Sequence, residues 1–165
     1  MPDVFLSIGS NIDREKHIPS ALKELEERVG SLTVSSVYES EAVGFEGARF
    51  YNLVAAFFTE LPVSDIAKIL TEIENNHGRT RDCKKFSSRT LDIDLILYGD
   101  AVLQEGKLKL PREDITRYAF VLEPLAEIAA KRKHPVIGES YGELWAKFDK
   151  TDVKQWRVGS VSDLS

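Results

Sequence analysis

Cysteine is almost absent from this sequence, since Cys83 is the only one among 165 residues. A single thiol excludes an internal disulfide and a metal site built from several cysteines. The sequence also lacks any apolar run close to the roughly 20 residues of a membrane-spanning helix. Its N-terminus does not show the charged and then apolar pattern of a secretion signal. We therefore expect a cytoplasmic protein that does not associate with membranes.

Positive charge is scarce as well, because 27 acidic residues outnumber 22 basic ones and leave a formal net charge of −5. This balance argues against a broad surface for nucleic acid. The hydrophobic share of 42% and the charged share of 30% are those of an ordinary soluble globular protein. Internal repeats and low-complexity segments are missing. We expect one domain over residues 1–165 that works as a monomer.

One stretch reverses the acidic balance and leads directly into a predicted strand. Residues 79–89 carry one anion, Asp82, and five cations: Arg79, Arg81, Lys84, Lys85 and Arg89. Residues 91–98 then alternate as a strand does, with one face formed by Leu91, Ile93, Leu95 and Leu97 and the other by Asp92, Asp94, Ile96 and Tyr98. The two aspartates should point the same way, with Cα atoms roughly 7 Å apart.

Two carboxylates on one strand face suit a divalent ion. Carboxylate oxygens are hard ligands, and two of them suit Mg²⁺ whose other positions are filled by water and phosphate oxygens. Arginines match phosphate oxygens with paired donors. Each feature alone is more often an exposed acidic face or a solvated loop. Side by side, they favour phosphoryl-type transfer from a nucleotide, in which positioning and charge neutralisation do most of the catalysis.

The first hundred residues predict an α+β fold. The expected elements are strands over 4–8, 32–39, 50–60 and 91–98, a helix started by Asn11 or Asp13 and ended by Gly30, and a helix after Pro62 that is capped by Ser64 and ends at His77-Gly78. The order βαββαβ is that of a ferredoxin-like antiparallel sheet with both helices on one face. The other face should be open for a ligand.

A C-terminal extension follows Gly99. It should contain a hairpin around Glu105-Gly106, a helix over 120–130 interrupted by Pro124, a helix over 141–148, a strand over 153–158 and a frayed end over 159–165.

The cationic loop and strand together resemble the signature of 6-hydroxymethyl-7,8-dihydropterin pyrophosphokinases, enzymes of folate biosynthesis. The matching residues are Arg89-Thr-Leu-Asp92-Ile-Asp94-Leu-Ile-Leu, the upstream Gly78-Arg79-Thr-Arg81 and the aromatic Phe86. Ile8-Gly9-Ser10-Asn11 and Phe50-x-Asn52 fit the family too. The resemblance implies transfer of the β,γ-diphosphate of ATP to the hydroxymethyl group of the reduced pterin, with release of AMP.

The resemblance also implies roles for individual residues. Asp92 and Asp94 would hold two Mg²⁺ ions, and Arg79, Arg81 and Arg89 would neutralise the diphosphate. Glu74 and Leu95 would line the nucleotide pocket. The pterin would be read by Ser40, Val43 and Asn52 and enclosed by Phe120 and either Phe50 or Tyr51, with Phe86 as an apolar plug. From the residues alone, the alternative for Asn52 is an edge or turn residue, and for Phe120 a core position is about as well supported as a ligand contact.

Three departures from the family pattern stand out. Phe86 occupies the usual tryptophan position, and Ser87-Ser88 replaces Gly-Pro. The Pro-His…Arg-x-Phe pattern becomes Pro111-Arg112…Tyr118-Ala119-Phe120. The positive charge that the missing histidine and arginine would direct at the triphosphate would come instead from Arg112, Arg117 or Lys107.

Two rival functions follow from the same features. A ferredoxin-like module that binds nucleotide or RNA without catalysis would use the sheet face, but two aspartates there would repel phosphates. A degenerate sensor of ATP or pterin would explain the departures between residues 112 and 118.

Overall fold

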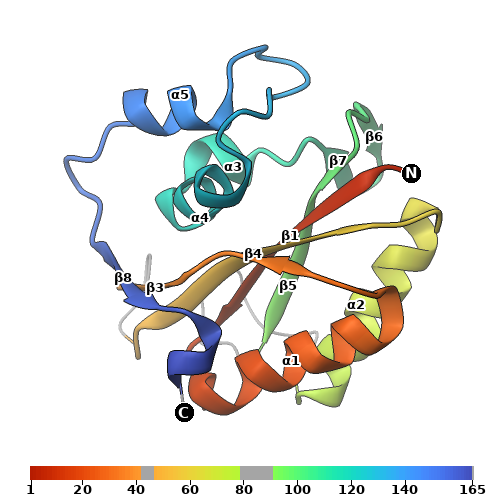
Figure 1. Ribbon diagram of the computed structural model, residues 1–165, viewed down its shortest axis with the longest axis vertical. Coiled ribbons are helices and arrows are strands. Elements are labelled where there is room, and N and C mark those ends of the chain that lie inside the picture. Colours follow the sequence, from red (N-terminus) through yellow and green to blue (C-terminus); the bar gives the residue numbers. More distant parts are fainter. Residues whose placement is uncertain (42–46, 79–90, 165) are drawn as a thin grey trace.

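The computed structural model describes residues 1–41, 47–78 and 91–164. Its first part runs β1 (Asp3–Ser10), α1 (Arg14–Val29), β2 (Thr33–Val34), β3 (Val37–Ser40), β4 (Phe50–Phe58), α2 (Val63–Asn76) and β5 (Asp92–Tyr98). The main sheet is antiparallel, in the order β5-β1-β4-β3-β8, and β2 pairs with β4. Helices α1 and α2 lie together on one face of this sheet (Figure 1). The α+β, ferredoxin-like fold predicted from the sequence is confirmed.

The C-terminal extension is part of the folded domain. It contains β6 (Leu103–Glu105), β7 (Leu108–Leu110), α3 (Asp114–Arg117), α4 (Ala119–Ala129), α5 (Tyr141–Lys147), β8 (Gln155–Gly159) and the 3₁₀ turn η1 (Val161–Leu164). The predicted hairpin is confirmed. The predicted break at Pro124 is wrong, because α4 continues through it at the cost of one backbone hydrogen bond. The predicted frayed end is also wrong, since Leu164 is 5% exposed and packs in the core.

The second face of the sheet is covered, so the expectation that it lies open is wrong. Helix α4 lies across it in Figure 1, with α5 on the outer side of α4. Helix α4 packs Val121, Leu122 and Leu125 against Val54 and Ile96 of the sheet. The sequence predicted a helix here but not its packing partner. A ligand site on this face therefore has room only where these helices leave the sheet uncovered.

A bulge in β5 changes which side chains share a face. Leu6 pairs with Leu95 and Phe5 with Leu97, so Ile96 is the extra residue. Leu97 joins Ile96 in the cluster beneath α4, and Tyr98 packs on the α1/α2 side. The predicted faces of Leu97 and Tyr98 are therefore wrong. The two aspartates precede the bulge, and their shared face is unaffected.

The predicted second strand is divided by Ser35 and Ser36. Ser35 Oγ accepts a hydrogen bond from the Val54 N–H at 2.9 Å and donates one to the Ser36 carbonyl at 2.8 Å. The side chain thereby takes over part of the ladder and separates β2 from β3.

The helix ends were placed nearly correctly, with Asp13 at the N-cap position of α1 as one of the two predicted residues, but the predicted Ser64 cap of α2 is wrong. Asp13 precedes α1 with a positive φ of 47°, and its side chain makes no cap hydrogen bond. Pro62, rather than Ser64, occupies the N-cap position of α2. Gly30 and Gly78 take positive φ values of 95° and 81° after the two helices, as the sequence predicted.

Within the described ranges, none of the helices has the length and apolar content needed to cross a membrane.

Glu127 ties α4 to β3 and gives a first testable prediction. Its Oε1 accepts from the Tyr38 hydroxyl at 2.6 Å, and its Oε2 accepts from the N–H and the hydroxyl of Ser36, both at 2.9 Å. Glu127→Gln is expected to lower the free energy of unfolding by about 1–2 kcal/mol, since an amide cannot accept all three bonds. Urea titrations at pH 7 measure this, and Glu27→Gln on the exposed side of α1 serves as the control.

The loss should depend on pH. Burial alone would raise the pKa of Glu127, but the hydrogen bonds from Tyr38 and Ser36 lower it below its ordinary 4.5. A lowered folded-state pKa means that the stabilisation is present above pH 4.5 and disappears as the pH falls through the folded-state pKa. This assignment would be contradicted if the difference in unfolding free energy between Glu127→Gln and the native protein stayed constant from pH 7 to pH 3.

Candidate functional site

A row of four residues crosses the sheet on the face that α4 covers. Gly9 of β1 pairs with Asp92 of β5 on one side and with Asn52 of β4 on the other, and Asn52 pairs with Tyr38 of β3. Directly paired residues share a face, and the Tyr38 hydroxyl reaches Glu127 on α4. All four therefore face the α4 side. We call Asp92, Gly9, Asn52 and Tyr38 the acid–amide row.

Gly9 leaves the middle of this row flat. A Cβ added there would lie 3.0 Å from Asn52 Oδ1 and 3.8 Å from Phe50 Cδ1. A glycine inside a strand often marks a close approach of a ligand or another backbone. A glycine within the first predicted strand region is the one signal in the sequence that could have given Gly9 a role in the site. Asp92 and Asn52 stand two strand spacings apart, about 10 Å, on either side of it.

The acidic end of the row is a concentration of negative charge. Asp94 lies two residues beyond Asp92 on the same face, and it pairs with Ser7 of β1. Burial and the neighbouring Asp92 raise the pKa of Asp94 to about 7, although Arg112 acts to lower it. The Arg112 Nη2 lies 3.7 Å from Asp94 Oδ1, and its Nε lies 3.4 Å from Asp114 Oδ2. One arginine therefore only partly compensates this cluster.

A divalent cation would relieve this repulsion. Among the residues that the structure describes, no three His, Cys, Asp or Glu side chains converge as a metal cage. Two carboxylates without a cage suit Mg²⁺, which keeps several waters and binds substrate phosphates. The donor set therefore fits Mg²⁺ carried by a nucleotide.

Glu74 also lies at this end. It comes from the last turn of α2, and its Oε2 accepts from the Ile93 N–H at 2.9 Å. Leu95, in contrast, is 6% exposed and packs in the α1/α2 core. Its side chain projects from the opposite face to Asp94, and its place beside the nucleotide stays a prediction.

The amide end of the row is buried and ordered by a hydrogen bond. The Asn52 Nδ2 donates to Ser40 Oγ at 2.8 Å, and both side chains are buried. Asn52 is neither an edge nor a turn residue, because β4 lies between β1 and β3. Phe50 shares its face, whereas Tyr51 packs in the core on the other side, with the Arg14 guanidinium 3.7 Å from its ring centre. Of the two predicted aromatic partners, only Phe50 faces this site.

Phe120 stands at the start of α4 and is half-buried. Its ring stacks on Tyr118, with ring centres 5.0 Å apart and planes 18° from parallel. A cavity of about 320 Å³ adjoins this pair. Its wall combines Ser40, residues 117–120 and a C-terminal segment from Phe148 to Gln155. Phe120 thus packs partly in the core and also lines a cavity.

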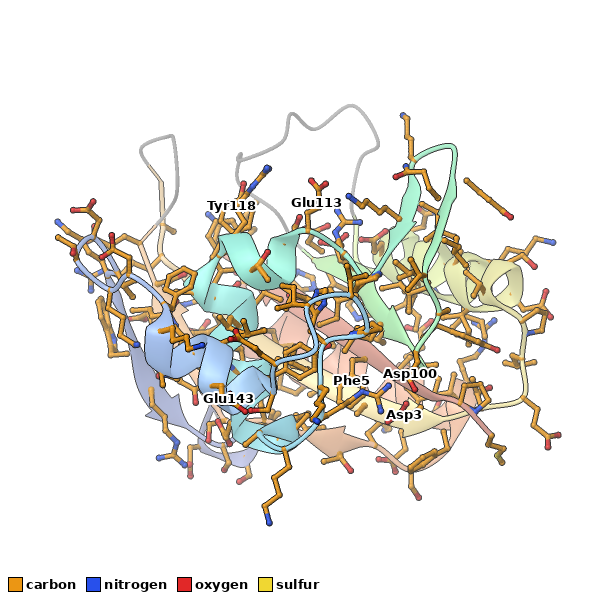
Figure 2. All side chains as sticks on the ribbon, turned by 90° about the horizontal axis from the view of Figure 1, so that it is seen from above. Asp3, Phe5, Asp100, Glu113, Tyr118 and Glu143 are labelled. Carbon is orange, nitrogen blue, oxygen red and sulfur yellow. The ribbon has the colours of Figure 1, made fainter. Side chains whose placement is uncertain are left out.

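Figure 2 shows where the site lies in the molecule. Tyr118 and Glu113 lie near the upper edge of the molecule in this view, whereas Asp3, Phe5 and Asp100 lie in its lower half. This agrees with the strand register, since Asp3 begins β1 and Gly9 lies near its end.

Other predicted site residues are placed less directly. Arg117 is exposed, lies 3.9 Å from Glu113 and lines the cavity. Lys107 is exposed in the turn between β6 and β7, and the described residues give it no contact with the acidic pair. Val43, Arg79, Arg81, Phe86 and Arg89 lie outside the described residues.

Comparison with known proteins gives this arrangement a family. The model of the family described as 7,8-dihydro-6-hydroxymethylpterin-pyrophosphokinase (HPPK) matches residues 5–130. The 2-amino-4-hydroxy-6-hydroxymethyldihydropteridine pyrophosphokinase of Aquifex aeolicus is 36% identical over 138 residues, which are 82% of this chain and 86% of that protein. The enzyme of the same name from Bacillus subtilis is 31% identical over 163 residues, 96% of this chain and 93% of that protein.

Solved structures agree on the fold. An HPPK-DHPS chain crystallised with substrates superposes with a TM-score of 0.70 at 13% identity, and it covers 94% of this chain. A triple-mutant HPPK-DHPS of Plasmodium falciparum gives a TM-score of 0.71 at 15% identity and covers 94% of this chain. This chain spans about half the length of those two, 46% and 45%. The resemblance seen in the sequence is confirmed, and the chain belongs to the 7,8-dihydro-6-hydroxymethylpterin-pyrophosphokinase family.

Proposed function

We propose that this chain transfers the β,γ-diphosphate of ATP to the hydroxymethyl group of 6-hydroxymethyl-7,8-dihydropterin. The hydroxymethyl oxygen forms a bond to the β-phosphorus, the bond from that phosphorus to the α,β-bridging oxygen breaks, and AMP leaves. The hydroxyl proton passes to solvent. The pairing of Asp92, Gly9 and Asn52 across three strands carries the proposal. It puts a carboxylate that would bind metal and an amide that would bind the heterocycle about 10 Å apart on one face.

The acidic end would receive the nucleotide. Asp92 and Asp94 would hold two Mg²⁺ ions, which supply charge neutralisation along the triphosphate when bound. Arg112 is already oriented there by Asp94 and Asp114. By family resemblance, Arg79, Arg81 and Arg89 would add the remaining positive charge, and Glu74 would border the nucleotide.

The amide end would receive the pterin. The Asn52 side chain offers both a donor and an acceptor to the edge of a flat heterocycle. Its bond to Ser40 fixes the orientation of that amide. Phe50 and Phe120 would cover the two faces of the ring, which excludes water without adding charge. Val43 and Phe86 are proposed pterin contacts from the family resemblance.

We also propose that the enzyme works as a single domain over residues 1–165, as a cytoplasmic monomer without nucleic acid. The pairing of β8 with β3 and the packing of Leu164 in the core support one folded unit. The rival RNA-binding function is not favoured, because Asp92 and Asp94 face the same side of the sheet as any bound backbone phosphates would.

The test is AMP formation from ATP with the reduced pterin and Mg²⁺, for the native protein, Asp94→Ala and Asp100→Ala. Asp100 provides the control because its side chain is 84% exposed and paired with Arg132, away from the site. Pterin- and Mg²⁺-dependent AMP that only Asp94→Ala loses would support the proposal. ATP binding without AMP from the native protein would instead identify a sensor.

Arg112 gives a second prediction, because it is the best placed of the three candidate cations. Arg112→Ala is expected to raise the Michaelis constant for ATP about tenfold or more, the typical loss of a charge-assisted contact to phosphate. Arg117→Ala and Lys107→Ala should change it less than about threefold, since exposed, screened charges contribute little. Steady-state kinetics with saturating pterin measures all three, and an unchanged constant in Arg112→Ala would remove the assignment.

A further inference from the structure

We propose that Gln155 of β8 is a positioning residue for the pterin. It lies beyond residues 5–130, which the family model matches, and it joins the start of α4 to β3. This inference rests on the proposed function, because it concerns the pterin end of the same site.

Gln155 is bonded to the start of α4 and paired with a pterin candidate. Its Nε2 donates to the Ala119 carbonyl at 3.1 Å and to Glu123 Oε1 at 2.6 Å, which uses both amide hydrogens. In the sheet, Gln155 pairs directly with Ser40, and Ser40 pairs with Phe50. Phe50, Ser40 and Gln155 therefore form a second row on the α4 face, two residues along the strands from the acid–amide row.

This link fixes Phe120 relative to Ser40. Phe120 follows Ala119 immediately, and both Phe120 and Ser40 line the 320 Å³ cavity, together with Gln155 itself. Before Ala119 the chain is extended at Tyr118, with φ −122° and ψ 127°. The first turn of α4 would have more freedom to shift without the Gln155 amide. A shift of about 1 Å in a positioning group is enough to weaken binding or catalysis markedly.

The rest of α4 does not depend on this link. Glu127, one turn beyond Glu123, bonds to Ser36 and Tyr38 of the β3 region. Leu125, Ala126 and Ala129 pack into the core beneath the helix. Loss of the Gln155 amide should therefore loosen the first turn of α4 while the helix stays in place, which separates a positioning role from a role in folding.

The test uses Gln155→Met, which keeps the length of the side chain and removes both donors. We expect the dissociation constant and the Michaelis constant for the pterin to rise about tenfold. The constants for ATP and the turnover number should change less than about twofold, and the unfolding temperature should fall by no more than about 3 °C. Trp156→Phe is the matched control, because Trp156 is the next residue, projects to the other face and bonds to Glu39 at 3.1 Å.

Each outcome decides the matter. A selective loss of pterin affinity in Gln155→Met, absent in Trp156→Phe, supports the proposal. Unchanged pterin affinity overturns it, as does an equal loss of pterin and ATP affinity, which would indicate a general effect on the fold. Isothermal titration with the reduced pterin, in the presence of a non-hydrolysable ATP analogue, measures affinity without turnover. The result stays informative even if the native protein forms no AMP, which would count against the proposed function alone.

Discussion

Replacement of Asp94 by asparagine is expected to lower kcat/KM about a thousandfold and, in the metal-free protein, to raise the unfolding temperature. The loss of activity follows from the loss of a metal ligand. The gain in stability follows from the removal of a partly buried charge that Asp92 repels and Arg112 only partly neutralises. A site that binds a cation tightly is strained while the cation is missing, and stability is commonly lost in this way at functional sites.

The sign of the pH dependence follows from the raised pKa. Burial and Asp92 raise the pKa of Asp94 from 3.8 to about 7. A carboxyl with a raised folded-state pKa binds its proton more tightly in the folded protein, so its contribution to stability falls as the pH rises from 3.8 to 7. Asp94→Asn should therefore resemble the native protein at low pH and exceed it at pH 8. A gain of about 1 kcal/mol would appear as about 3 °C in a protein of this size.

Thermal unfolding in EDTA at pH 5 and pH 8 measures the effect, and Asp100→Asn is the control, since the exposed Asp100 makes no contact with Asp92 or Asp94 among the described residues. Added Mg²⁺ should stabilise the native protein more than the variant and narrow the gap. A variant less stable than the native protein at pH 8 without metal would show that Asp94 stabilises the fold, contrary to the raised pKa.

Local pattern was enough to find the acidic end of the site. The side-chain period of a strand is two, so the shared face of Asp92 and Asp94 needed no knowledge of their neighbours. The same rule gave wrong faces for Leu97 and Tyr98. The bulge at Ile96 arises in the pairing of β5 with β1, which residues 91–98 do not specify by themselves.

Long-range pairing explains most of what the sequence could not give. The order βαββαβ places β1 between β4 and β5, so the approach of Asn52 to Asp92 follows from the predicted fold. The pairing of Gln155 with Ser40 joins residues 115 positions apart, with no motif at either residue to announce it. Similarly, a helix over 120–130 was predicted, but its packing against Val54 and Ile96 was not.

The departures in the segment from 112 to 118 became clearer once the side chains were placed. The sequence left Arg112, Arg117 and Lys107 as equal substitutes for a missing charge. Only Arg112 lies beside the acidic pair, because its backbone N–H donates to the Ile96 carbonyl at 3.0 Å and holds it against β5. Tyr118 instead stacks on Phe120, at the pterin end.

Asn52→Leu is expected to lower kcat/KM for the pterin by about a thousandfold or more, while ATP binding stays within about twofold. A site built to hydrogen-bond a heterocycle loses most of its affinity when the amide is replaced, because the polar edge of the ligand is then buried without partners. Leucine is close to asparagine in shape, and the position is 5% exposed in the interior strand β4. The variant should therefore fold, with the Ser40 hydroxyl losing its donor.

The same amide chemistry elsewhere in the chain supplies the control. Asn76 also donates through Nδ2, to Glu24 Oε1 at 2.6 Å, but it links α2 to α1 on the other side of the sheet. Asn76→Leu should leave pterin affinity unchanged. Titration calorimetry with the reduced pterin and a non-hydrolysable ATP analogue measures the affinity for each substrate separately.

If Asn52→Leu binds pterin as tightly as the native protein does, the heterocycle does not bind at the acid–amide row. The cavity beside Phe120 is then the next candidate for the pterin site. If pterin and ATP affinity fall together, the substitution has disturbed β4 and both ends of the row, and Asn52→Ser, which keeps a small polar side chain, would distinguish packing from recognition.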